Sequence, residues 1–232
     1  MNNGHSLLRV FKLIGLVLIL WVNISACAGL FGIGGDSWKE EVLLHDGSKI
    51  VVERSQSYGG RHEIGQPSPV KEQSITFTMP SSNKSITWKD EFSEDIGHSN
   101  FNLLALHILN GTPYIAVSPN GDLAYNKWGR PNPPYVFFKY DGKAWQRISV
   151  EYFPTEFKTI NLVISTLTYR KELTSQSLVH AGLVNKLNGS SGPEEYKTII
   201  RTPLDHWKPR PEYKGPKAPH PITPTTTDGK SN

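Results

Sequence analysis

Three residues of the chain have the types that nucleophilic catalysis uses. They are Ser37, which follows Gly35 and Asp36, and the pair formed by Asp95 and His98. A serine hydroxyl becomes a nucleophile when a neighbouring base accepts its proton, and a histidine oriented by an aspartate can be that base. The surroundings argue against this chemistry. A serine of this kind directly follows a buried strand, whereas Ser37 follows a glycine-rich stretch and the Asp95 and His98 pair lies in mid-chain.

The same residues resemble the Gly-Asp-Ser and Asp-x-x-His blocks of the GDS family of esterases and lipases. That resemblance implies Ser37 as the nucleophile and His98 as the base. A three-residue motif also arises by chance, and the context does not fit. We therefore expect no catalytic residue and no enzyme activity, and rank an esterase last among the alternatives.

The remaining histidines and the single cysteine do not form a metal site. None of the histidines takes part in a compact ligand spacing such as HExxH or HxH, and one cysteine cannot build a multi-thiolate zinc site or an internal disulfide. His107 lies in an apolar run, which predicts a core or edge position. We expect no metal and no cofactor. Apart from His5 in the N-terminal segment, these other histidines are His45, His62, His107, His180, His206 and His220.

Aromatic residues are concentrated between positions 125 and 157. A flat ring with neighbouring hydrogen-bond donors can stack on a sugar ring or hold a proline-rich or extended peptide. Our candidate ligand-binding residues are Tyr125, Trp128, Arg130 and Tyr135. The alternative interpretation is that these rings belong to the hydrophobic core.

The N-terminal segment has the pattern of a secretion signal. Arg9 and Lys12 precede an apolar run at residues 13–22, and small residues follow it. Residues 24–27, Ile-Ser-Ala-Cys, resemble the lipobox of bacterial lipoproteins. That resemblance implies cleavage before Cys27, attachment of acyl chains such as palmitate to it, and, because Ala28 is not aspartate, the outer membrane as destination.

The whole chain resembles uncharacterised proteobacterial lipoproteins, most clearly in residues 38–48 and 125–138. This group implies a location and no activity. Two or more acyl chains make attachment to a membrane effectively permanent. The alternative topology is an uncleaved transmembrane anchor, because residues 13–35 carry no charge.

Alternation of apolar and polar residues, punctuated by Asp-Gly and Asn-Gly turns, predicts a mainly β fold of the α+β class. We expect antiparallel hairpins that form a sandwich or a meandering sheet, with one or two short C-terminal helices at 174–187 and from 193. The predicted strands cover residues 42–45, 49–53, 74–79, 85–88, 101–109, 114–117, 135–140 and 145–152, with a further apolar stretch at 160–164.

The predicted organisation is a signal peptide at 1–26, a lipidated glycine-rich stalk at 27–37, one mostly β domain at 38–206 and a disordered, proline-rich basic tail at 207–232. The net charge of +4 is too small to indicate a nucleic-acid partner. We predict a lipid-anchored protein on the periplasmic side of the outer membrane that binds an envelope protein or glycan without catalysis. An immunity or inhibitor lipoprotein directed against an effector is the alternative.

Overall fold

The structure is a computed structural model that describes residues 35–189, 192–205, 215 and 217–222. The predicted signal peptide, Cys27 and most of the predicted stalk lie outside these residues. The first strand begins at Asp36, within the last residues of the predicted stalk at 27–37. Among the described residues, no helix is both long and apolar enough to cross a membrane.

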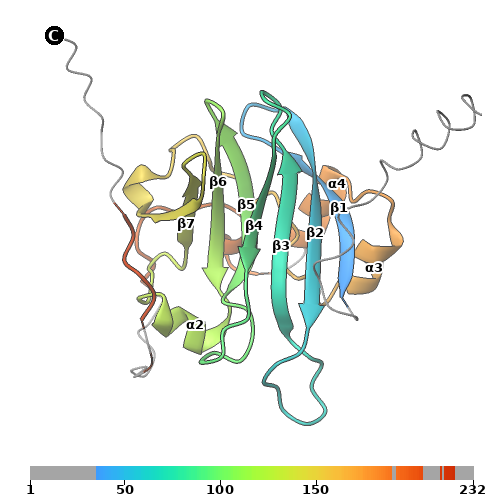
Figure 1. Ribbon diagram of the computed structural model, residues 1–232, viewed down its shortest axis with the longest axis vertical. Helices are drawn as coiled ribbons and strands as arrows, with labels where there is room; N and C mark the ends of the chain where they lie inside the picture. The colour runs from blue at the N-terminus through green and yellow to red at the C-terminus, as the bar shows by residue number, and fades with distance from the viewer. Residues whose placement is uncertain (1–34, 190–191, 206–214, 216, 223–232) are drawn as a thin grey trace, which may run out of the picture. The chain divides into compact units, whose positions relative to one another are not determined.

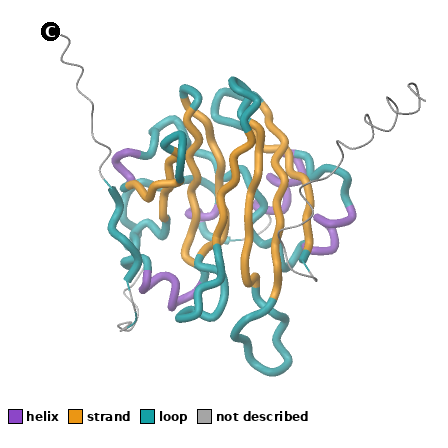
Figure 2. Tube along the Cα trace, viewed as in Figure 1, coloured by secondary structure: helices purple, strands orange, loops and turns teal. Residues whose placement is uncertain are grey.

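In the described part of the chain, the strands form two four-stranded antiparallel sheets (Figures 1 and 2), in the orders β1-β2-β3-β4 and β5-β6-β7-β8. The mainly β fold predicted from the hairpins is therefore confirmed. The strands are β1 Asp36–Leu43, β2 Lys49–Tyr58, β3 Val70–Thr78, β4 Ser85–Asp90, β5 Phe101–Leu109, β6 Thr112–Pro119, β7 Val136–Tyr140 and β8 Trp145–Ile148.

The turns between β1 and β2, β5 and β6, and β7 and β8 contain the Asp-Gly or Asn-Gly dipeptides predicted from the sequence, whereas the turn between β3 and β4 contains neither. Asn110 and Gly111, between β5 and β6, have φ angles of 51° and 71°. Positive φ at both central residues is the requirement of the tight type I′ turn, and asparagine and glycine meet it at the lowest steric cost. The chain therefore reverses here without opening the two strands.

The two sheets pack against each other through a shared hydrophobic core. In β2, burial alternates along the strand, so that Ile50 and Val52 face this core while Val51 is exposed. Trp88 of β4 meets Phe101 and Phe138 of the second sheet, with ring centroids 6.2 and 5.8 Å away. The first sheet thus has one buried face, as strict alternation predicts.

The second sheet is buried on both faces. Its far face packs against the segment that follows β8, in which Phe153 and Phe157 have almost no exposed surface. This explains the nearly continuous apolar sequence of β5, because a strand covered on both sides has no polar face.

The helices are short and differ in part from those expected. They are α2 Gly121–Lys127, α3 Arg170–Ser175 and α4 Ala181–Gly189, with single 3₁₀ turns at Val150–Tyr152 and Glu194–Tyr196. The helix expected from 174 begins only at Ala181, because Val179 forms a parallel bridge with Glu40 on the edge of β1. The apolar stretch at 160–164 forms no regular strand. In Figure 1, α3 and α4 lie beside β1.

Part of the predicted mobile tail is held against the domain. Ile222 forms a parallel bridge with Ile148 of β8, and the Ala218 N–H donates to the Lys127 carbonyl at 2.9 Å. At these residues the tail therefore has fixed contacts.

Candidate functional site

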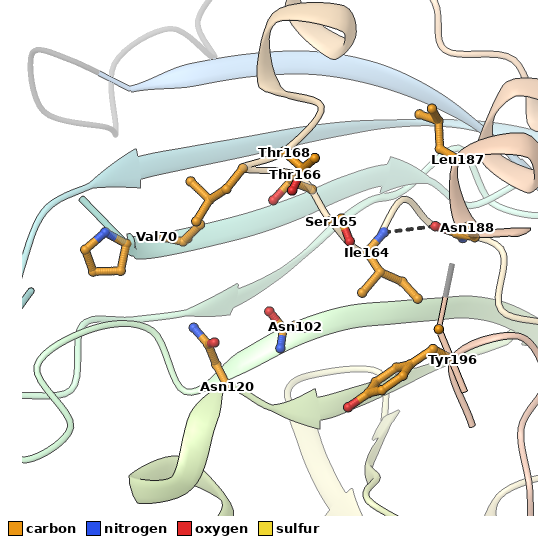
Figure 3. Close-up of a pocket in the computed structure, with 13 residues that line it drawn as sticks. Val70, Asn102, Asn120, Ile164, Ser165, Thr166, Thr168, Leu187, Asn188 and Tyr196 are labelled. Atoms are coloured by element: carbon orange, nitrogen blue, oxygen red, sulfur yellow. Dashed lines mark hydrogen bonds between the residues drawn. The ribbon is translucent and has the colours of Figure 1, made fainter. Parts of the chain in front are cut away.

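A cavity of about 430 Å³ lies where residues 164–168 pass the beginnings of β3 and β5 and the end of α4 (Figure 3). Parts of the chain that are far apart in the sequence therefore contribute to its wall. Its lining residues are Pro69, Val70, Asn102, Asn120, Ile164, Ser165, Thr166, Leu167, Thr168, Leu187, Asn188, Gly192 and Tyr196.

The polar groups of this cavity are all neutral at pH 7. The described residues that line it include no aspartate, glutamate, lysine, arginine or histidine. Amide and hydroxyl groups both donate and accept hydrogen bonds. The lining is thus suited to a polar, uncharged ligand, and it offers no carboxylate, imidazole or amine as a general acid or base.

Asn102 is the central polar side chain of the cavity. It projects from β5 toward the space that Ser165 and Thr166 border from the other side (Figure 3). Within the described chain, no hydrogen bond engages its amide. Ser118, its partner across the β5 and β6 ladder, also has a buried hydroxyl for which the described residues provide no hydrogen bond. The Asn102 side chain is partly exposed where it lines the cavity, so its amide is accessible to a ligand.

Asn120 provides the second amide beside Asn102. It directly precedes α2, yet its side chain makes no capping hydrogen bond to that helix. Its Nδ2 instead donates to Ser99 Oγ at 3.3 Å. This contact orients the amide and leaves its oxygen as an acceptor for a ligand.

Asp90 fixes the start of β5 and thereby positions Asn102. Its two carboxylate oxygens accept the backbone N–H groups of Asn100 and Phe101, at 3.1 and 2.8 Å. Gln73 donates to the same carboxylate at 3.3 Å. Burial raises the pKa of Asp90 even though these hydrogen bonds favour its charged form.

The opposite wall is held by two asparagines. Asn188 accepts the Ile164 N–H at 3.2 Å and donates to the Leu162 carbonyl at 2.8 Å. Asn161 donates to the carbonyls of Leu43 and Leu106, at 2.9 and 2.8 Å, and so connects this wall to both sheets. The wall is therefore preformed rather than assembled around a ligand.

A buried ion pair forms hydrogen bonds with the backbone of the same wall at Val163. Arg54 and Glu40 lie 3.1 Å apart with 1% and 0% of their side chains exposed. Arg54 Nη1 donates to the Val163 carbonyl at 2.7 Å, and Glu40 accepts the Val163 N–H at 3.3 Å. A third donor to Glu40 is the Trp38 indole, at 2.7 Å. The two charges thus pair with each other and with the wall they support, while the buried Arg54 Nε has no hydrogen-bond partner among the described residues.

A second cavity, of about 450 Å³, shares Leu167 and Thr168 with the first. Its lining includes Tyr58 and Arg170, whose guanidinium lies 4.0 Å from the centre of the Tyr58 ring. Both side chains donate hydrogen bonds to Asp36. The hydrogen bond from Arg170 lowers the pKa of Asp36, and burial raises the pKa of Tyr58. This cavity therefore has a charged border, unlike the first.

The four aromatic-loop residues proposed from the sequence do not line the first cavity. Tyr125 and Tyr135 are 8% and 4% exposed, and the Tyr135 hydroxyl donates to the Glu195 carbonyl at 2.7 Å. Trp128 is half-buried, and its ring centroid lies 4.4 Å from that of Phe101. Arg130 donates to Asn126 at 2.7 Å. The alternative interpretation, that the rings belong to the core, accounts for Tyr125 and Tyr135.

The serine and histidine considered for catalysis are not joined. Ser37 is an exposed residue of β1, and within the described chain no hydrogen bond connects it to His98. The His98 ring contacts the Ser99 carbonyl at 2.7 Å, and Asp95 forms an ion pair with Lys127 at 2.8 Å. Over the described residues, no cluster of three or more His, Cys, Asp or Glu side chains could hold a metal ion.

Sequence reasoning did not find the cavity residues. The available signal was Asn102 itself, a polar residue within the apolar run of β5. Ser165, Thr166 and Asn188 lie in a region whose sequence resembles any polar connection, so nothing in it indicated a shared site.

Comparison with known proteins adds no family or function. No family model matches the chain, and neither a curated protein nor a solved structure is significantly similar to it.

Proposed function

We propose that the protein binds an uncharged saccharide unit in the Asn102 cavity and does not transform it. The observation that carries this proposal is a preformed cavity whose polar lining, among the described residues, consists only of amides and hydroxyls, with the Asn102 amide unpartnered in the same part of the chain. A volume of about 430 Å³ lies in the range of small-molecule sites, roughly 300 to 1,000 Å³.

The mixture of lining groups favours a sugar. Each sugar hydroxyl donates and accepts hydrogen bonds. Amide side chains such as those of Asn102 and Asn120 can both accept from such a hydroxyl and donate to it. The C–H faces of a sugar ring are apolar, and Ile164 and Leu187 offer apolar surface in the same cavity. A carboxylated or phosphorylated ligand would find no cation among the described lining residues, so its desolvation would oppose binding.

We further propose that the domain is tethered by acyl chains at Cys27 on the periplasmic side of the outer membrane. The support is the sequence of residues 13–27. An envelope glycan would then be the ligand within reach of the cavity. In cells, Cys27→Ser should yield a protein that no longer incorporates labelled palmitate, and unchanged labelling would contradict the tether.

Calorimetric titration tests the cavity. Neutral chitobiose and its analogues should bind, whereas a carboxylated disaccharide of the same size should not. Asn102→Leu removes the amide with little change in volume. It should weaken binding by about tenfold to a hundredfold, because buried polar groups of the ligand lose a partner worth about 1 to 3 kcal/mol.

Gln176→Leu is the matched control, because Gln176 is an exposed amide at the end of α3 and does not line the cavity. Binding that favours the carboxylated sugar, or that Asn102→Leu leaves unchanged, would refute the proposal.

A further inference from the structure

The outer edge of β8 is occupied by a part of the chain that lies far beyond it in sequence. In the sheet order β5-β6-β7-β8, the strand β8 pairs with β7 on one side only. On its other side, Ile222 forms a parallel bridge with Ile148, and its N–H donates to the Arg147 carbonyl at 2.9 Å. In Figure 1 this segment, drawn in red, runs beside α2.

Arg147 holds the segment from the side. Its guanidinium lies 5.3 Å from the centre of the Trp128 ring and donates to the Trp128 carbonyl at 3.0 Å. The same group donates to the Pro219 carbonyl. Because the Trp128 contacts fix the guanidinium independently of the tail, it is positioned to donate a hydrogen bond to a peptide carbonyl.

The hydrogen bonds of the segment match its prolines. Residues 218–222 read Ala-Pro-His-Pro-Ile. The N–H groups that donate are those of Ala218 and Ile222, while Pro219, which has no N–H, contributes its carbonyl. The contacts are thus made by backbone groups that any extended peptide with this proline spacing can supply.

The fit of the tail is incomplete. Ile222 remains 47% exposed, and it borders a cavity of about 650 Å³ that Met79, Ile86 and Tyr140 also line. A larger apolar side chain at this position would bury more surface than Ile222 does. The edge therefore has space that the chain's own tail does not use.

We propose that this edge of β8 is a docking site for an extended, proline-containing peptide of a partner protein, and that residues 217–222 occupy it until such a peptide displaces them. Added strands of this kind gain affinity from backbone hydrogen bonds, and a tethered segment keeps the edge covered meanwhile. The site is separate from the Asn102 cavity and does not depend on it.

The test releases the tail within the full chain. Ile222→Pro removes the N–H that donates to Arg147, whereas His220→Pro adds a proline where, among the described residues, no hydrogen bond uses the N–H. The probe is a labelled synthetic peptide with the sequence of residues 215–222, followed by fluorescence anisotropy. Equal thermal unfolding midpoints establish that the variants are folded.

A tail that fills the edge in about nine of ten molecules leaves about one tenth of the sites open, so its release should raise the apparent affinity for the peptide about tenfold. His220→Pro should bind as the wild type does. Adding Arg147→Ala to Ile222→Pro should abolish the increase in affinity for the peptide.

Failure of the folded Ile222→Pro protein to bind the peptide more tightly than the wild type would overturn the proposal. Light scattering provides a second criterion. A concentration-dependent dimer that Ile222→Pro dissolves would overturn it as well, because the occupant would then be the tail of a second copy.

Discussion

Lowering the pH from 7 to 4 should remove about 3 kcal/mol of the free energy of unfolding through His107 alone. This side chain is fully buried in β5 and stacks on Phe157 with ring centroids 4.7 Å apart. Its Nε2 donates to the Thr159 carbonyl at 3.0 Å, and its buried Nδ1 has no hydrogen-bond partner in the part of the chain that the structure describes. Burial lowers the pKa of His107 from 6.5 to about 4.

The direction of this change in stability follows from the number of protons that the folded and unfolded chains bind. Between pH 6.5 and about 4, the histidine of the unfolded chain takes up a proton and that of the folded chain does not, so stability falls as the pH decreases through this window. About 2 kcal/mol should be lost by pH 5, and the loss should level off below pH 4. Asp90 acts in the opposite direction. Because its pKa is raised above 3.8 in the folded protein, the folded protein binds a proton where the unfolded chain does not, and this group adds stability as the pH falls.

Urea denaturation at several pH values measures the effect. His107→Phe keeps a ring against Phe157 and removes the titrating group. It leaves the Thr159 carbonyl without a donor, so the variant should be less stable at pH 7, but its free energy of unfolding should change little between pH 7 and 5. His62→Asn, at an exposed position in the loop between β2 and β3, should retain the wild-type pH dependence. If His107→Phe lost as much stability between pH 7 and 5 as the wild type, the buried neutral state of His107 would be refuted.

Two further predictions concern buried charge and backbone space. Arg54→Met should lower the free energy of unfolding by about 3 to 5 kcal/mol by leaving Glu40 charged and unpaired in the core, and adding Glu40→Gln should recover part of that loss in the same urea assay. Gly60→Ala should be strongly destabilising, because its φ is 96° and a Cβ would lie 2.1 Å from the Gly97 carbonyl oxygen; Gly182→Ala in α4, where a Cβ meets nothing within 4 Å, should instead raise stability by up to about 1 kcal/mol. Equal thermal midpoints for the two alanine variants would contradict the backbone argument.

The strands could be predicted because their signals are local. Alternation in β2 reports the one buried face of the first sheet, and the Asn110 and Gly111 turn is set by backbone sterics. The far-face cover of the second sheet could not be predicted, since the apolar residues of β5 do not reveal that Phe153 and Phe157 will be their partners. The placement of Val179 on the edge of β1, which delays the start of α4, likewise depends on a contact between distant residues.

The candidate site could not be predicted from the sequence, because it also depends on contacts between distant residues. Tyr135 has the type and the setting of a ligand-binding aromatic, but its hydroxyl is bound to the Glu195 carbonyl, from a segment 60 residues away. Asn102 and Asn188 become one site only when the two sheets and α4 are assembled. A polar residue inside an apolar strand indicates that a specific partner is needed, and only the fold shows whether that partner comes from the chain.

The attachment of the cavity wall to both layers has a mechanical consequence. Asn161 joins the end of β1 to β5, so a sliding displacement of one sheet over the other would have to break these bonds or carry the wall along and alter the width of the opening. A bound ligand that prefers one width would resist such shear. Ligand bound in the cavity would then slow amide hydrogen exchange along β1 and β5, including at residues that do not contact the ligand.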